Sequence, residues 1–88
     1  MEDLTQLPNI GPTLAEKLQA IGVTSYDDLV NLGSVEAVLK IKEEDLSTCY
    51  NMLYALEGAI RKLRWHAIPK EERQIVKEEF DRAREKRG

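Results

Sequence analysis

The chain has 88 residues, and its 13 Lys and Arg against 16 Asp and Glu give a net charge of −3 with His neutral. Hydrophobic residues make up 42% and charged residues 33%, which excludes a disordered or fibrous chain. No apolar run approaches the roughly 20 residues that span a bilayer. One cysteine and one histidine exclude an internal disulfide and a Cys/His zinc site. We expect one cytoplasmic domain without metal or cofactor.

The charge is divided unevenly along the chain. Residues 1–60 hold three basic and ten acidic residues, a net charge of −7, whereas residues 61–88 hold ten basic and six acidic residues, a net charge of +4. An acidic body repels phosphate at long range and a basic segment attracts it. Nucleic-acid binding therefore depends on where folding places the basic segment.

The first two expected elements lie before residue 24. A short helical turn over residues 3–7 is stopped by Pro8, and a helix begins at Pro12, where a missing N–H costs nothing. Gly22 should end that helix with a positive φ. Val23 then follows as the apolar closure of a Schellman ending.

Two short helices are expected next. Thr24 or Ser25 is expected to cap the first of them, Ser25 with Asp28 three residues later resembles a capping box, and Gly33 ends this helix. Ser34 is expected to cap the following helix. The charged residues 42–45 are expected to form a loop.

The longest predicted helix runs from about residue 47 to 65. Its apolar seam has spacings of 3, 4, 3, 4 and 3 residues and comprises Leu46, Cys49, Leu53, Leu56, Ile60 and Leu63. Because its other faces are also apolar, we expect a central helix. Gly58 predicts close approach by another helix, and Glu57 is expected to pair with Arg61 four residues later. Cys49 is expected to be a buried small hydrophobe.

The last helix should begin after Pro69. Its narrow apolar stripe comprises Ile75, Val76, Phe80 and Ala83. Such a helix either lies across the body or exchanges with a second chain, which would give a homodimer. With no strand signal anywhere, the fold class is an all-α bundle of five to six helices around the long central helix.

The segment from Leu7 to Leu18 reads LPNIGPTLAEKL and resembles the helix-hairpin-helix motif of DNA repair proteins. In that family the turn reads Pro-Gly-Ile-Gly, and its backbone N–H groups bind phosphate at a helix N-terminus. Asn9 stands at the first glycine and Thr13 at a position that is often basic. The resemblance implies phosphate contacts by Asn9, Ile10, Gly11, Thr13 and Lys17. The alternative is a turn that only packs against its neighbours.

A second resemblance covers most of the chain, from Leu7 to Pro69. This run is similar to the C-terminal domain of TfoX (Sxy), a regulator of bacterial competence. The matching segments are residues 7–12, Gly22-Val23, Asp28-Leu29, residues 32–37, residues 51–60, Trp65-His66 and Pro69. The resemblance implies a helical, hairpin-containing domain, in which we distinguish residues 1–33, 34–68 and 69–88. It also implies a link to the control of DNA-uptake genes in a bacterial cytoplasm.

No set of catalytic residues can be assembled, so we expect no enzyme activity. The leading hypothesis is a regulatory or adaptor module that recognises a protein partner. The alternative is weak, salt-sensitive binding of a DNA backbone by the turn and Lys17, helped by Arg61, Lys62 and Arg64. If these three cations flank the turn, phosphate binding is favoured. If only the acidic side chains Glu16, Asp27 and Asp28 flank it, phosphate binding is disfavoured.

Overall fold

The computed structural model describes residues 4–43 and 50–87, and within these ranges every regular element is a helix. The all-α prediction is therefore confirmed. The elements are the 3₁₀ turns η1 (Leu4–Gln6) and η2 (Trp65–Ala67) and the helices α1 (Pro12–Ala20), α2 (Tyr26–Leu32), α3 (Ser34–Glu43), α4 (Tyr50–Arg61) and α5 (Lys70–Arg87). None of the described helices combines the length and apolar character needed to cross a membrane.

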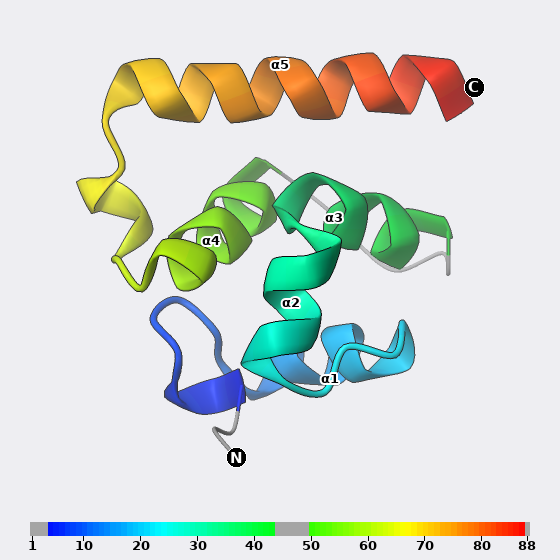
Figure 1. Cartoon of the computed structure of the whole chain (residues 1–88), viewed down its shortest axis with the longest axis vertical. Coiled ribbons are helices and arrows are strands. Elements are labelled where there is room, and N and C mark those ends of the chain that lie inside the picture. The colour runs from blue at the N-terminus through cyan, green and yellow to red at the C-terminus, as the bar shows by residue number, and fades with distance from the viewer. Residues whose placement is uncertain (1–3, 44–49, 88) are drawn as a thin grey trace.

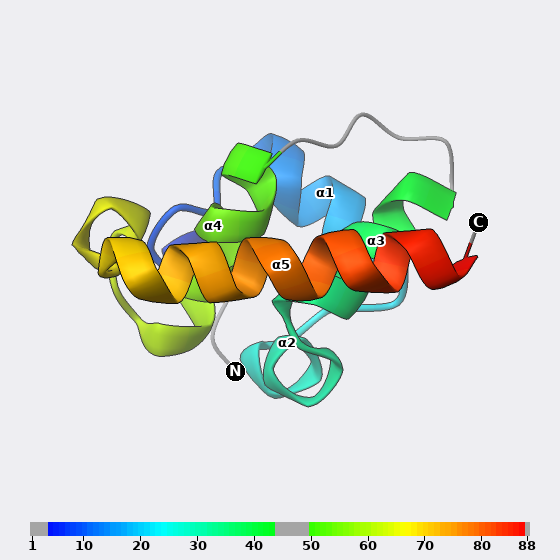
Figure 2. The same cartoon turned by 90° about the horizontal axis from the view of Figure 1, so that it is seen from above.

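The helices form three layers, with α3 and α4 in the middle (Figure 1). Helix α5 crosses both of them on one side, as the view from above also shows (Figure 2). Helices α1 and α2 and the turn η1 lie on the other side. Buried apolar side chains from every layer form one core, including fully buried Leu18, Leu29, Val38, Leu53 and Leu56.

Two helix ends confirm the local sequence signals. Gly22 takes a φ of +88°, and the Val23 N–H donates to the Leu18 carbonyl at 2.9 Å, which completes the Schellman ending of α1. Ser25 caps α2, because its hydroxyl oxygen accepts from the Asp28 N–H at 3.1 Å. The Thr24 N–H donates to the Asp28 carboxylate at 3.1 Å, and this bond lowers the pKa of Asp28 below its ordinary value.

The start and the end of α3 both differ from expectation. Ser34 is the first residue of the helix rather than its cap, and its hydroxyl donates to Glu57 Oε1 at 2.7 Å. Lys42 and Glu43 belong to the helix rather than to a loop. The remainder of that expected loop, the start of the expected central helix and the expected burial of Cys49 fall in residues 44–49, outside the described ranges.

Helix α4 ends at Arg61, four residues earlier than predicted. The longest described helix is therefore α5 rather than α4, and α4 shares the central layer of the fold with α3. The helix stops because Lys62 adopts a φ of +59°. The N–H groups of Lys62 and Leu63 then donate back to the carbonyls of Ala59 and Gly58 at 3.1 and 2.8 Å. This is a second Schellman ending with lysine at the usual glycine position. Leu63, expected on the buried seam, is instead 40% exposed.

A chain of polar contacts joins α3, α4 and α5. Glu57 accepts from Ser34 and also pairs with Arg61 Nε at 2.8 Å, which confirms the predicted pair within α4. The Arg61 guanidinium continues to Glu72 in the first turn of α5. Both carboxylates raise the pKa of Arg61, with Glu57 the stronger influence. Arg61 therefore fixes the start of α5 against α4.

The middle of α5 is held by apolar and aromatic contacts. Val76 and Phe80 are buried, and the Phe80 ring meets Tyr50 edge-to-face with 5.9 Å between ring centroids. The Tyr50 hydroxyl donates to Asp81 Oδ1 at 2.7 Å. This hydrogen bond lowers the pKa of Asp81, as do the nearby charges of Lys77 and Arg84.

We predict that Tyr50→Phe makes the stability of the domain less dependent on acid pH. Because the folded state lowers the pKa of Asp81 from its ordinary value of 3.8, the bond stabilises the fold above that pH. Its contribution is lost as the pH falls through the lowered pKa. Denaturant titrations should show a larger loss of unfolding free energy at neutral pH than well below 3.8. An equal loss at both pH values would contradict this role.

Candidate functional site: the cavity beside the N-terminal turn

The N-terminal turn, residues 7–11, connects η1 to α1. The Leu7 N–H donates to the Leu4 carbonyl at 3.1 Å, and the Ile10 N–H donates to the Leu7 carbonyl at 3.4 Å. Leu7 and Ile10 are buried, so both anchor the turn in the core. Between them Asn9 takes a φ of +70°, a left-handed conformation that asparagine tolerates better than most residues.

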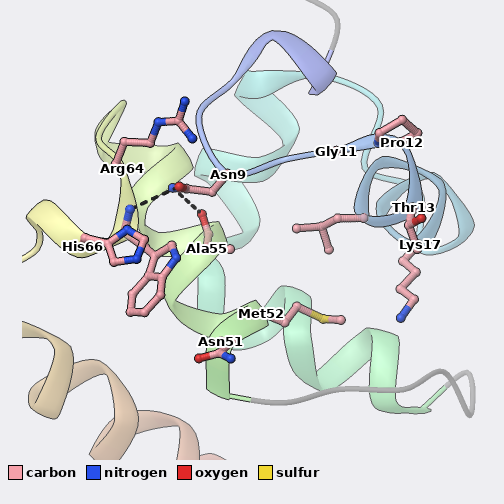
Figure 3. Close-up of a pocket in the computed structure, with 12 residues that line it drawn as sticks. Asn9, Gly11, Pro12, Thr13, Lys17, Asn51, Met52, Ala55, Arg64 and His66 are labelled. Atoms are coloured by element: carbon pink, nitrogen blue, oxygen red, sulfur yellow. Dashed lines mark hydrogen bonds between the residues drawn. The ribbon is translucent and has the colours of Figure 1, made fainter.

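The side chain of Asn9 ties this turn to the end of α4. Its Nδ2 donates to the Ala55 carbonyl at 3.3 Å, and its Oδ1 accepts from the Trp65 N–H at 3.2 Å (Figure 3). The same Nδ2 also donates to the Leu63 carbonyl at 2.9 Å. Ala55 lies within α4 and Leu63 follows its last residue, so these bonds hold the turn against both the helix and the chain after it. At Asn9 the turn therefore packs against its neighbours, which is the alternative that the sequence left open.

Gly58 makes room for that amide. A Cβ built on Gly58 would lie 2.5 Å from Asn9 Nδ2 and 2.7 Å from the Leu63 carbonyl oxygen. The predicted close approach is therefore present, but the neighbours are the turn and the chain after α4 rather than another helix.

A cavity of about 540 Å³ opens between the turn, α1, α4 and η2. We call it the turn cavity. Its lining comprises Asn9, Gly11, Pro12, Thr13, Leu14, Lys17, Asn51, Met52, Ala55, Arg64, Trp65 and His66. Arg64 and His66 lie on one side of it, with Thr13 and Lys17 on the other (Figure 3). None of the lining residues is acidic.

The first turn of α1 lines this cavity and has no side-chain cap. Gly11 is the N-cap residue with an extended backbone, and it supplies no side-chain cap. The N–H groups of a first helical turn have no acceptor within the helix. Gly11, Pro12 and Thr13 are all exposed. The positive end of the helix dipole adds to this surface, so the site suits an anion.

The cations expected to help the turn are separated by the fold. Arg64 lines the turn cavity and makes no ion pair within the described part of the chain. Arg61 is committed to Glu57 and Glu72, and Lys62 lies over the Tyr26 ring, 4.7 Å from its centroid. Ile10 belongs to the turn through its backbone only, since its side chain is buried.

The acidic side chains that would disfavour phosphate are placed elsewhere. Asp28 lines a separate hollow with Lys40 at the opposite end of α1, and neither Glu16 nor Asp27 lines the turn cavity. Across residues 4–43 and 50–87, no group of three or more His, Cys, Asp or Glu side chains could hold a metal ion. The local charge at the cavity is therefore opposite in sign to the net charge of the chain.

Seven residues of the cavity lining are not among the contacts expected from the sequence: Pro12, Leu14, Asn51, Met52, Ala55, Trp65 and His66. The available signal for Asn51 and Met52 was a polar asparagine among the apolar residues of the first turn of α4. The positions of Trp65 and His66 depend on the chain reversal at Lys62, which the periodic seam concealed.

We predict that Asn9→Gly lowers the unfolding free energy by about 1–3 kcal/mol, because glycine keeps the positive φ and removes the three bonds. Gly58→Ala should also destabilise by about 1–3 kcal/mol through overpacking. The two losses should be less than additive, since Asn9→Gly removes the atom nearest the new methyl group. Urea titrations of both single variants and the double variant test this. Additive losses would show that Asn9 does not press on Gly58.

Two crystal structures of uncharacterised proteins from Listeria monocytogenes are similar to this chain. The triclinic form is 41% identical, with 86% of each chain covered and a TM-score of 0.82. The tetragonal form, described as a protein of unknown function, is 38% identical, with 92% of this chain and 99% of that chain covered and a TM-score of 0.84. No curated protein matches significantly.

The family model of the TfoX C-terminal domain matches residues 1–80. This range contains the turn, the whole turn cavity and α5 as far as the buried Phe80. The resemblance seen in the sequence is thus confirmed over most of the molecule, and the chain belongs to the TfoX C-terminal domain family.

Proposed function

We propose that the domain is a non-catalytic regulatory or adaptor module that binds the sugar–phosphate backbone of nucleic acid at the turn cavity. The observation that carries this proposal is the charge of the cavity. Lys17 and Arg64 line it together with the start of α1, and no lining residue is acidic. This local charge arises in a chain whose first 60 residues carry a net charge of −7.

The proposed contacts use general features of phosphate recognition. Backbone N–H groups of the first α1 turn would bind phosphate oxygens without reading the base sequence. The positive charges of Lys17 and Arg64 would attract the same phosphates. With about two phosphates neutralised, affinity should be weak and should fall with salt, with a log–log slope of about −2. The remaining acidic surface would weaken binding further at low salt.

The test is a fluorescence-anisotropy titration of a labelled duplex at several salt concentrations. Arg64→Glu should weaken binding by roughly tenfold or more, because it removes one charge-assisted contact. Arg82→Glu is the matched control, since this exposed α5 residue does not line the cavity. No binding at tens of micromolar protein would contradict the proposal, and so would equal losses in the two variants.

A second variant avoids any effect of Arg64 on the chain reversal. Gly11→Glu places a carboxylate at the start of α1, where a Cβ meets no atom within 4 Å and φ is −94°. The fold should therefore tolerate it, as thermal melting can verify. Binding that survives Gly11→Glu combined with Lys17→Glu would place the contact elsewhere.

Recognition of a protein partner is the second candidate. It is favoured by Val30 on α2, a large apolar side chain that is 44% exposed, and by the exposed acidic residue Asp27 on the same helix. If the domain recognises a protein instead, the titration should show that the folded domain binds no nucleic acid. Recovery of one reproducible partner from a bacterial cytoplasm would then support it.

A further inference from the structure

The turn cavity is more than a phosphate-binding surface. In a duplex the phosphates lie outside and the bases are stacked within, so backbone contacts require only exposed donors and cations. Here the donors and cations surround a hollow of about 540 Å³, within the usual range of small-molecule sites. Binding of a duplex backbone leaves this hollow without a role.

The interior of the cavity differs from its edge. Leu14, Met52 and Ala55 give it apolar walls, and Asn51 adds a side-chain amide. Methionine adapts its shape to different flat partners. Such walls suit a nucleobase, which has apolar faces and hydrogen-bonding edges.

An aromatic cluster supports one wall of the cavity. Trp65 packs near-parallel to Tyr54, with centroids 6.2 Å apart, and lies 3.9 Å from the His66 ring. The Arg73 guanidinium lies 5.7 Å from the centroid of the Trp65 ring. Contacts from α4, η2 and α5 therefore hold this wall in place, and His66 remains exposed at the cavity.

We propose that the turn cavity accepts an unpaired nucleobase and that the preferred ligand is single-stranded nucleic acid. This inference rests on the proposed backbone binding. Lys17 and Arg64 lie on opposite sides of the hollow (Figure 3), so they can contact the phosphates before and after a base that enters it. Unstacked bases are available in single strands and not within a duplex.

The experiment compares a labelled single strand with a duplex of the same length and label at one salt concentration. The single strand should bind at least about fivefold more tightly, the lower end of what one base–aromatic contact contributes. Ala55→Leu fills the cavity without changing charge, and leucine is a good helix former. This variant should reduce the preference for the single strand, because it should lower single-strand affinity more than duplex affinity while Lys17 and Arg64 remain.

His66→Ala is the second variant, because it removes an exposed ring and should leave the core intact. It should also lower single-strand affinity selectively. Equal affinities for single strand and duplex, with Arg64 still required, would overturn this inference and leave the proposed function standing. Absence of binding to either ligand would overturn both.

A poly-glutamate peptide of matched charge is the competitor. It should displace the single strand only at much higher concentration, because it offers anions without bases. Displacement at an equal concentration of charges would show that the cavity recognises charge alone, and would overturn the inference.

Discussion

The C-terminal end of α4 is the point on which the arrangement of the other elements depends. The Asn9 amide donates to the carbonyls of Ala55 and Leu63, and the Tyr26 hydroxyl donates to the Ile60 carbonyl at 2.5 Å. The Tyr26 hydroxyl thus supplies a donor to one of the last four carbonyls of α4, and the Asn9 amide ties the N-terminal turn to the helix and to the chain after it. The same contacts place the N-terminal turn opposite residues 64–66, and this placement creates the turn cavity.

The basic C-terminal segment is divided by these contacts into residues with different roles. Arg61 holds α5 to α4 through Glu57 and Glu72, whereas Lys62 covers the Tyr26 ring. Only after the chain reverses at Lys62 does Arg64 reach the turn cavity. The net charge of −3 is therefore a poor guide to binding, because the sign of the charge at the cavity is set by which residues the α4 ending brings together.

The sequence predicts those features that depend on neighbouring residues. The Gly22 ending, the Ser25 cap and the Glu57–Arg61 pair all follow from signals within a few positions. The end of α4 does not, because the apolar spacing continues through Leu63 and lysine rarely replaces glycine at such an ending. Since the cavity is built around this ending, the places of Trp65 and His66 in its lining could not be predicted. The turn, Lys17 and Arg64 were expected to act together, and the structure brings them to one cavity.

The central claim is that the turn and residues 64–66 form one binding surface. Mapping of amide chemical shifts during titration with a short single strand tests it most directly. We expect the changes to concentrate at the backbone amides of Gly11, Thr13 and Arg64 and at the side-chain amide of Asn9. Resonances of α5 should remain unchanged. Changes concentrated on α5 or on the start of α2, with none at the turn, would contradict the account.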